Sequence, residues 1–195
     1  MQQCGPTLSK SKITEAPRVE PELAGRLERI YGLERRPKGP REFFQLLRVF
    51  SKKSPRTKAF LALVRSGKAV IGASERATKD WIIGANGEKV FTYCSYDILM
   101  TAILRRESVI GSSCPHCGKA MSIRIKGGKL ENFSPKEMMF LWGTGPEGSP
   151  GNPMCDHLHL FPSREHMSAW LKSREGEMGF SFKVPDAVNY FVSRF

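Results

Sequence analysis

The chain has 195 residues, of which 40% are hydrophobic and 26% charged, and its formal net charge is +12. This length allows one domain, or one and a half, with a buried core, and the composition is that of a globular rather than a disordered protein. No apolar run approaches the ~20 residues that span a bilayer. Residues 1–6 lack the basic-then-apolar pattern of a signal peptide, so we expect a cytoplasmic protein without a membrane partner.

The positive charge is concentrated in the first part of the chain. Residues 1–80 contain 18 Lys/Arg and 8 Asp/Glu, a net charge of +10, whereas residues 81–195 contain 13 and 11, a net charge of +2. A solvated basic surface is the simplest interpretation of this excess. Contact with nucleic acid, or attraction of anions and acidic partners, stays open as an alternative.

Residues 1–19 are polar and contain two prolines, which predicts a flexible tail. Residues 20–80 carry three helical patterns, over 22–31, over 41–50, and from a capping Ser54-Pro55 pair to Val64. Three short helices with a basic exterior can form a small winged-helix-like unit. They can equally form a helical cap on the part that follows.

From residue 81 the periodicity changes to that of strands. Residues 81–83 and 90–93 are apolar and flank Asn86-Gly87, which is typical of a hairpin with a two-residue type I′ turn. The pattern after Cys94 is helical as far as Leu104. Residues 121–125 alternate between apolar and polar and precede two glycines, which predicts a second hairpin.

The last part of the chain mixes strands and helices. Residues 138–142 fit either a strand or a short helix, and residues 143–153 contain four Gly and three Pro, which predicts a loop that delivers Cys155. A strand is predicted over 158–161 and a helix after Ser163. The chain as a whole is therefore predicted to be α+β. The helical unit of residues 20–80 precedes a β-rich domain over 81–195, with a mostly antiparallel sheet and flanking helices.

Four of the five cysteines lie in three short motifs: Tyr-Cys-Ser-Tyr-Asp at residues 93–97, Ser-Cys-Pro-His-Cys-Gly at 113–118, and Met-Cys-Asp-His-Leu-His at 154–159. An odd number of cysteines in a chain without a signal peptide predicts reduced thiols rather than a disulfide framework. Thiolates are soft ligands, so the set indicates either structural zinc or chemistry on a soft metal.

The Cys-x-x-Cys pair of Cys114 and Cys117 has zinc-knuckle spacing, and Cys94, Cys155 or a histidine could complete a tetrahedral site. Each isolated cysteine could also be a small buried residue without a chemical role. A zinc site gives no reason for the acid in the first motif, however. There, Asp97 follows Cys94 by one helical turn, so a thiol and a carboxylate are expected side by side.

A pair of thiols beside a carboxylate suits the cleavage of a carbon–metal bond. Cys94 and Cys155 could hold a soft metal ion while Asp97 transfers a proton. The histidines receive no metal role. His157 and His159 lie two residues apart near the start of the predicted strand, and we expect structural hydrogen bonds from both. The other two are predicted to be an exposed turn residue, at His116, and a helical residue without an assigned role, at His166.

These motifs resemble those of the organomercurial (alkylmercury) lyases. Residues 93–97 resemble the family's aromatic-Cys-x-x-Asp motif, and residues 155–161 resemble its later cysteine with the His-x-His that follows. Residues 112–123 are similar to the family's structural cysteine and the strand after it. Trp170 matches a tryptophan in the family's next helix. The resemblance covers about residues 88–195, and Cys117 has no counterpart in it.

The resemblance implies protonolysis of a carbon–mercury bond to give a hydrocarbon and Hg(II). Cys94 and Cys155 would bind the mercury, Asp97 would deliver the proton, and Cys114 would be structural. No cofactor is implied. The partners would be an organomercurial or other organometallic molecule, low-molecular-weight thiols, and a mercuric reductase that accepts the product.

Two other hypotheses remain at the level of sequence. One is a zinc-containing nucleic-acid-binding module, built from Cys114, Cys117 and the basic residues 1–80. The other is a soft-metal-binding protein that keeps the two thiols of Cys94 and Cys155 but has no catalytic activity. Only the lyase gives Asp97 a role.

Overall fold

The computed structural model describes residues 20–31, 33–40, 42–43, 55–84, 86–145 and 155–192. The tail predicted for residues 1–19 lies outside this part of the chain, as do Ser54, most of the helix predicted over 41–50, and most of the loop predicted over 143–153. Of that loop, Gly143 and Thr144 are described and belong to a strand.

The helices that the structure describes are α1 (Pro21–Tyr31), α3 (Pro55–Arg65), α4 (Ser95–Arg105), α5 (Arg164–Lys172), α6 (Val184–Val192) and the short 3₁₀ helix η2 (Cys155–His157). The helices predicted for residues 22–31, 55–64, 95–104 and after Ser163 are thereby confirmed. Within the described residues no helix has both the length and the apolar character to cross a membrane.

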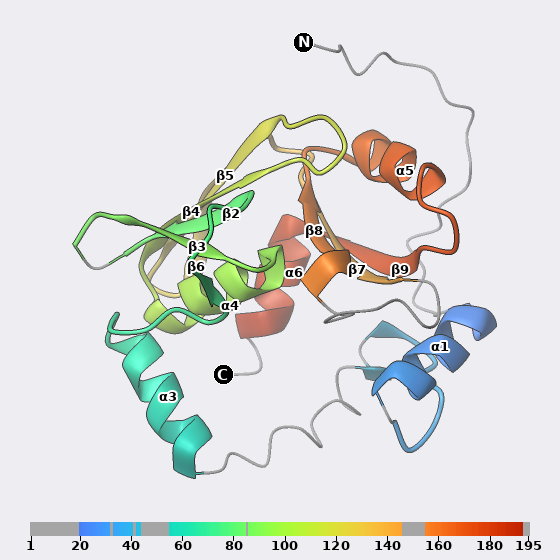
Figure 1. The fold of residues 1–195 in the computed structure, drawn as a ribbon, viewed down its shortest axis with the longest axis horizontal. Coiled ribbons are helices and arrows are strands. Elements are labelled where there is room, and N and C mark those ends of the chain that lie inside the picture. Colours follow the sequence, from blue (N-terminus) through green and yellow to red (C-terminus); the bar gives the residue numbers. More distant parts are fainter. Residues whose placement is uncertain are drawn as a thin grey trace.

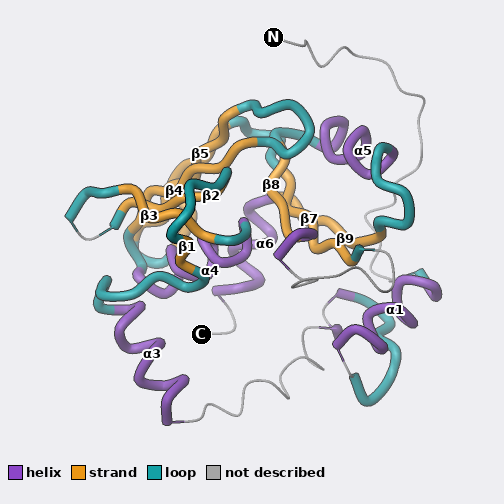
Figure 2. Tube along the Cα trace, viewed as in Figure 1, coloured by secondary structure: helices purple, strands orange, loops and turns teal. Residues whose placement is uncertain are grey.

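The strands form two sheets, in which every pairing is antiparallel (Figures 1 and 2). The larger sheet has the order β1-β3-β2-β4-β5-β6 and the smaller the order β8-β7-β9. Their strands are β1 (Ala73–Ser74), β2 (Asp80–Ile83), β3 (Lys89–Thr92), β4 (Ser108–Ser113), β5 (Ala120–Lys126), β6 (Lys129–Ser134), β7 (Met139–Thr144), β8 (Leu158–Phe161) and β9 (Met178–Lys183). The predicted α+β fold with antiparallel sheets is confirmed.

Both predicted hairpins form, but the turn of the first one differs from the prediction. Ile83 pairs with Lys89, so residues 84–88 separate the strands, and the two-residue type I′ turn is wrong. Gly84 and Glu88 close the longer loop instead, because the Gly84 N–H donates to the Glu88 carbonyl at 2.7 Å. In the second hairpin Gly127 and Gly128 form the turn with positive φ angles, as predicted. The open choice at residues 138–142 is decided in favour of a strand, β7.

Helix α4 is the central element of the core. It contacts β2 and β4 of the larger sheet, β8 of the smaller sheet, and helices α3 and α6 (Figure 1). Ile98, Leu99 and Ala102 are completely buried, and each of the two larger side chains contributes about 1.5–3 kcal/mol through burial. Because α4 is packed on several sides, the residues at its N-terminus are held in fixed positions.

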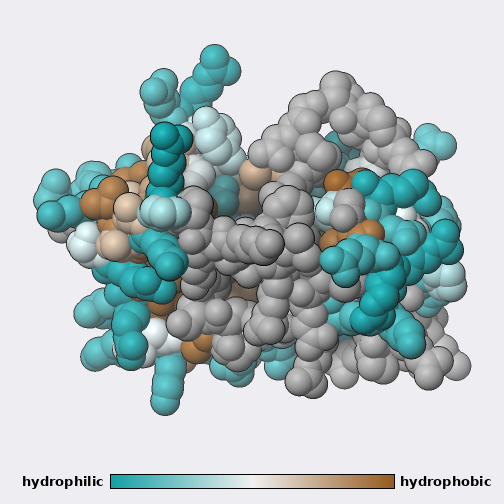
Figure 3. Space-filling model, turned by 90° about the horizontal axis from the view of Figure 1, so that it is seen from below, coloured by the Kyte–Doolittle hydropathy of each residue, from teal (hydrophilic) through white to brown (hydrophobic). Residues whose placement is uncertain are grey.

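One face of the molecule shows how polar and apolar residues are distributed on the described surface. Seen from below, the described surface is mostly hydrophilic, with small separate hydrophobic patches (Figure 3). Helix α3 contributes two of the exposed large apolar side chains, Phe60 and Leu63.

Candidate functional site

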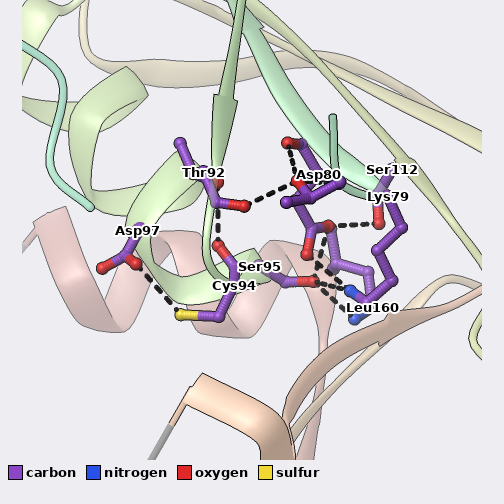
Figure 4. Close-up of polar contacts among 9 residues, drawn as sticks. Lys79, Asp80, Thr92, Cys94, Ser95, Asp97, Ser112 and Leu160 are labelled. Atoms are coloured by element: carbon purple, nitrogen blue, oxygen red, sulfur yellow. Dashed lines mark hydrogen bonds and ion pairs between the residues drawn. The ribbon is translucent and has the colours of Figure 1, made fainter. Parts of the chain in front are cut away.

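The structure brings the three predicted site residues together at the N-terminus of α4. Cys94 is the N-cap of this helix in an extended conformation, and Asp97 lies in its first turn. The Cys94 thiol donates a hydrogen bond to Asp97 Oδ2 at 3.3 Å (Figure 4). Cys155, the first residue of η2, completes the group, since its sulfur and the ligand atoms of the other two all lie within 4.8 Å of one another.

The two thiols differ in burial and therefore in acidity. Cys94 is only 1% exposed, whereas Cys155 is half-buried. The single proton of Cys94 can turn from Asp97 to a thiolate at Cys155, and this hydrogen bond between the two sulfurs lowers the pKa of Cys155 below its usual value. The same hydrogen bond, followed by burial and by the negative charge of Asp97, raises the pKa of Cys94. Cys155 is accordingly the thiol that ionises first, and Cys94 is the one that keeps its proton.

Asp97 is a buried carboxyl whose pKa is raised, chiefly by desolvation. The hydrogen bond from Cys94 opposes this effect, and the negative charge of Asp80 adds to it. A carboxyl group in this environment takes up and releases a proton more readily at moderate pH than an exposed aspartate does.

Gly72 packs directly against Asp97. A Cβ atom at this position would lie 2.1 Å from Asp97 Oδ2, and Gly72 has a φ of +58°. The segment is fixed on α4 because the Ile71 N–H donates to Thr101 Oγ1 at 3.0 Å. Only glycine therefore leaves room for the carboxylate in its present position.

A second buried carboxylate, Asp80, holds the start of α4 in place (Figure 4). It is completely buried, and its Oδ1 accepts hydrogen bonds from Ser95 at 2.9 Å and Ser112 at 2.5 Å. Its Oδ2 pairs with Lys79 Nζ at 2.5 Å. Ser95 Oγ also accepts the N–H of Leu160 at 3.1 Å, so this network joins α4 to strands of both sheets. It orients the residue next to Cys94 without contacting the thiol.

Aromatic side chains from distant parts of the chain adjoin the thiols. Tyr31, at the end of α1, accepts a hydrogen bond from Trp142 Nε1 at 3.3 Å. Burial raises the pKa of Tyr31 to about 12, and a thiolate at Cys155 acts on it in the same direction. Tyr96 packs edge-on against Trp142, with ring centroids 5.2 Å apart.

The sequence analysis missed Gly72, Asp80, Tyr31 and Trp142 as parts of this region. None of them lies in a cysteine motif. The sequence offers one local indication, at Asp80, because a carboxylate at the start of an otherwise apolar strand is unusual. It does not show which residues Asp80 contacts.

The histidines near Cys155 differ from the prediction. His157 belongs to η2 rather than to the strand that contains His159. The hydrogen bond expected of His157 is present, because its Nδ1 lies 2.7 Å from Glu177 Oε2. His159 lies in β8 and packs against Trp170, and burial lowers its pKa to about 2, so its ring is neutral.

Cys114 and Cys117 lie in a separate group. Cys114 is buried directly after β4, and both sulfurs face Nδ1 of His166 in α5, at 3.9 Å and 3.3 Å. The role of His166 was missed, because nothing in the local sequence connects it to the two cysteines. His116 is exposed, as predicted.

Comparisons with known proteins identify the family and the fold. The alkylmercury lyase family model matches residues 74–192. Among solved structures, the crystal structure of the mercury-bound form of MerB2 matches with a TM-score of 0.50 and 17% sequence identity, over 76% of this chain and 78% of that chain. The likeness to that structure concerns the fold. A search of curated proteins gave no match. The family match extends over more than half of the chain and includes all three motifs, and the chain therefore belongs to the alkylmercury lyase family.

Proposed function

We propose that this protein is an organomercurial lyase that cleaves the carbon–mercury bond by protonolysis, with Cys94, Cys155 and Asp97 as its reacting groups. The observation that carries the proposal is their gathering at the N-terminus of α4, two thiols and a carboxyl within 4.8 Å. Two thiolates can hold one soft mercury ion, and a carboxyl at this distance can supply the proton that the departing carbon needs. The chain's own side chains thus provide the two sulfur ligands and the proton donor that cleavage of the bond requires.

Cys155 makes the first bond to mercury. It is the more exposed of the two thiols and the one with the lowered pKa, so its thiolate is available to an incoming organomercury–thiol complex. Attack on the metal forms the bond between Cys155 and mercury. The small thiolate that arrived with the substrate leaves with its bonding electron pair.

Cys94 then joins the metal. Its proton passes to Asp97, with which it already shares a hydrogen bond of 3.3 Å, and the new thiolate bonds to mercury. The metal now carries two protein sulfurs and the organic group. Donation from two thiolates increases the electron density on the carbon bonded to mercury and prepares it to accept a proton.

Asp97 delivers that proton to the carbon. The carbon–mercury bond breaks, its electron pair forms the new carbon–hydrogen bond, and the hydrocarbon departs. Hg(II) stays between Cys94 and Cys155, and Asp97 is again a carboxylate. One thiol and one thiolate from solution, or from a mercuric reductase, then take the metal, and the proton of that thiol returns to Cys94, so both cysteines are regenerated. The buried position of Asp97 keeps the proton available for transfer until it reaches the carbon.

The test follows benzene release from phenylmercury in excess small thiol, by gas chromatography. Wild type is compared with Cys94→Ser, Cys155→Ser and Asp97→Asn, and with Asp186→Asn as a matched control, since Asp186 is an exposed carboxylate in α6. Mercury that stays with the protein after gel filtration is measured in parallel.

Asp97→Asn is expected to retain mercury but to lose ~10²–10⁴-fold in turnover, the range for removal of a general acid. Both cysteine variants are expected to lose turnover, and Asp186→Asn to keep it. Wild-type turnover in Asp97→Asn would refute the role of the carboxyl. A wild type that binds mercury without releasing benzene would instead be a soft-metal-binding protein without this activity.

A further inference from the structure

The group of Cys114, Cys117 and His166 lies outside the proposed reaction site and has no part in that chemistry. Two of its members follow β4 of the larger sheet, and the third lies in α5, which follows β8 of the smaller sheet. The two sulfurs and one ring nitrogen all lie within 4.8 Å of one another. Two thiols and an imidazole that converge from distant elements form a typical donor set for zinc.

The turn that carries the two cysteines has the geometry of a metal-binding knuckle. The Gly118 N–H donates to the Cys114 carbonyl at 2.8 Å, and the Cys114 N–H donates to the Lys119 carbonyl at 2.9 Å. Gly118 has a φ of +74°, which allows the chain to reverse immediately after the second cysteine.

The position of the imidazole distinguishes this group from a pair of cysteines that would only form a disulfide. His166 Nδ1 lies 3.3 Å from the sulfur of Cys117 and 3.9 Å from that of Cys114, so it faces both. Distances of this size between donor atoms fit three ligands around one tetrahedral ion with bonds of ~2.0–2.3 Å. A disulfide has no need of a third donor.

We propose that Cys114, Cys117 and His166 bind one Zn(II) ion as a structural site. His116 is exposed nearby, with its ring centroid 6.4 Å from that of His166. The ion would connect the turn between β4 and β5 to α5, and so tie the larger sheet to the smaller one. This connection is independent of the organomercurial reaction.

The experiment measures zinc in the full chain, purified with reduced thiols and reconstituted with zinc alone. Variants Cys117→Ser and His166→Gln remove a ligand, and Cys94→Ser is the matched control because it removes a thiol from the other group. Zinc per chain is determined by elemental analysis after gel filtration, and circular dichroism verifies that each variant is folded. Cobalt(II) is then substituted for zinc, since its visible absorption reports tetrahedral thiolate ligation.

Wild type and Cys94→Ser are expected to hold about one zinc per chain and to give the tetrahedral cobalt spectrum. In both ligand variants the zinc content per chain should fall by about tenfold or more. A chelator should lower the melting temperature of wild type and Cys94→Ser but not that of the ligand variants. The proposal is overturned if folded wild type takes up no zinc, if either ligand variant retains it, or if Cys94→Ser loses it. None of these readouts depends on mercury turnover.

Discussion

Gly72→Ala should slow the proposed reaction without replacing any reacting group. The new Cβ would lie 2.1 Å from Asp97 Oδ2 and 2.5 Å from its Cγ, whereas real Cβ contacts do not fall below 3.0 Å. The carboxylate and the backbone of residue 72 must therefore move apart by about 0.9 Å. Because Oδ2 is also the atom that accepts the Cys94 hydrogen bond, the movement separates the acid from its proton source.

The expected loss in kcat/KM is ~10²-fold, the effect of misplacing a catalytic group by about 1 Å. The substitution also strains the backbone by about 1–2 kcal/mol, because the φ of Gly72 is positive. Gly127→Ala is a control for that strain, since Gly127 has a φ of +60° and a Cβ there would have nothing within 4 Å.

The assay compares hydrocarbon release by the two variants in excess thiol, with urea unfolding to confirm that both are folded. Mercury binding is measured alongside, and we expect Gly72→Ala to retain it because the two thiols are unaltered. If Gly72→Ala turns over within about threefold of Gly127→Ala, the carboxylate position does not limit the reaction and our reasoning is wrong.

Three further predictions concern charge and stability. First, because the pKa of Asp97 is raised, its contribution to stability is present at low pH and is lost as pH rises through the folded-state pKa. Asp97→Asn should therefore have a higher melting temperature than wild type at neutral pH, and this difference should close on acidification. A difference in melting temperature that does not change with pH would contradict this reasoning. Second, Asp80→Ala leaves the Ser95 and Ser112 hydroxyls without their acceptor and should lower the free energy of unfolding in urea by about 1–3 kcal/mol, against no change in Asp186→Asn. Third, kcat/KM should rise with pH as Cys155 ionises and level off below the free-thiol value of 9.0; a rise centred above that value would rule out Cys155 as the first nucleophile.

The sequence alone was sufficient where the signal was local. The helical pattern after Cys94 placed Asp97 one turn later, and a spacing of three residues on a helix brings the two side chains to the same side whatever the rest of the fold does. The alternation in β5 and the paired glycines after it predicted that hairpin for the same reason. The prediction for the turn between β2 and β3 failed because Asn-Gly also occurs in longer loops. The hydrogen bond between Gly84 and Glu88 closes a five-residue loop here instead.

The tertiary structure decided which distant residues meet. Cys155 lies beside Cys94 only because β8, which follows η2, packs against α4, and Gly72 lies against Asp97 only because its segment is anchored on Thr101. The pairing of His166 with Cys114 and Cys117 depends likewise on where α5 lies relative to the turn after β4. Motif and periodicity determine local conformation and the chemical type of the groups. Contacts across the chain depend on how many buried side chains pack at once, and no single stretch of sequence carries that information.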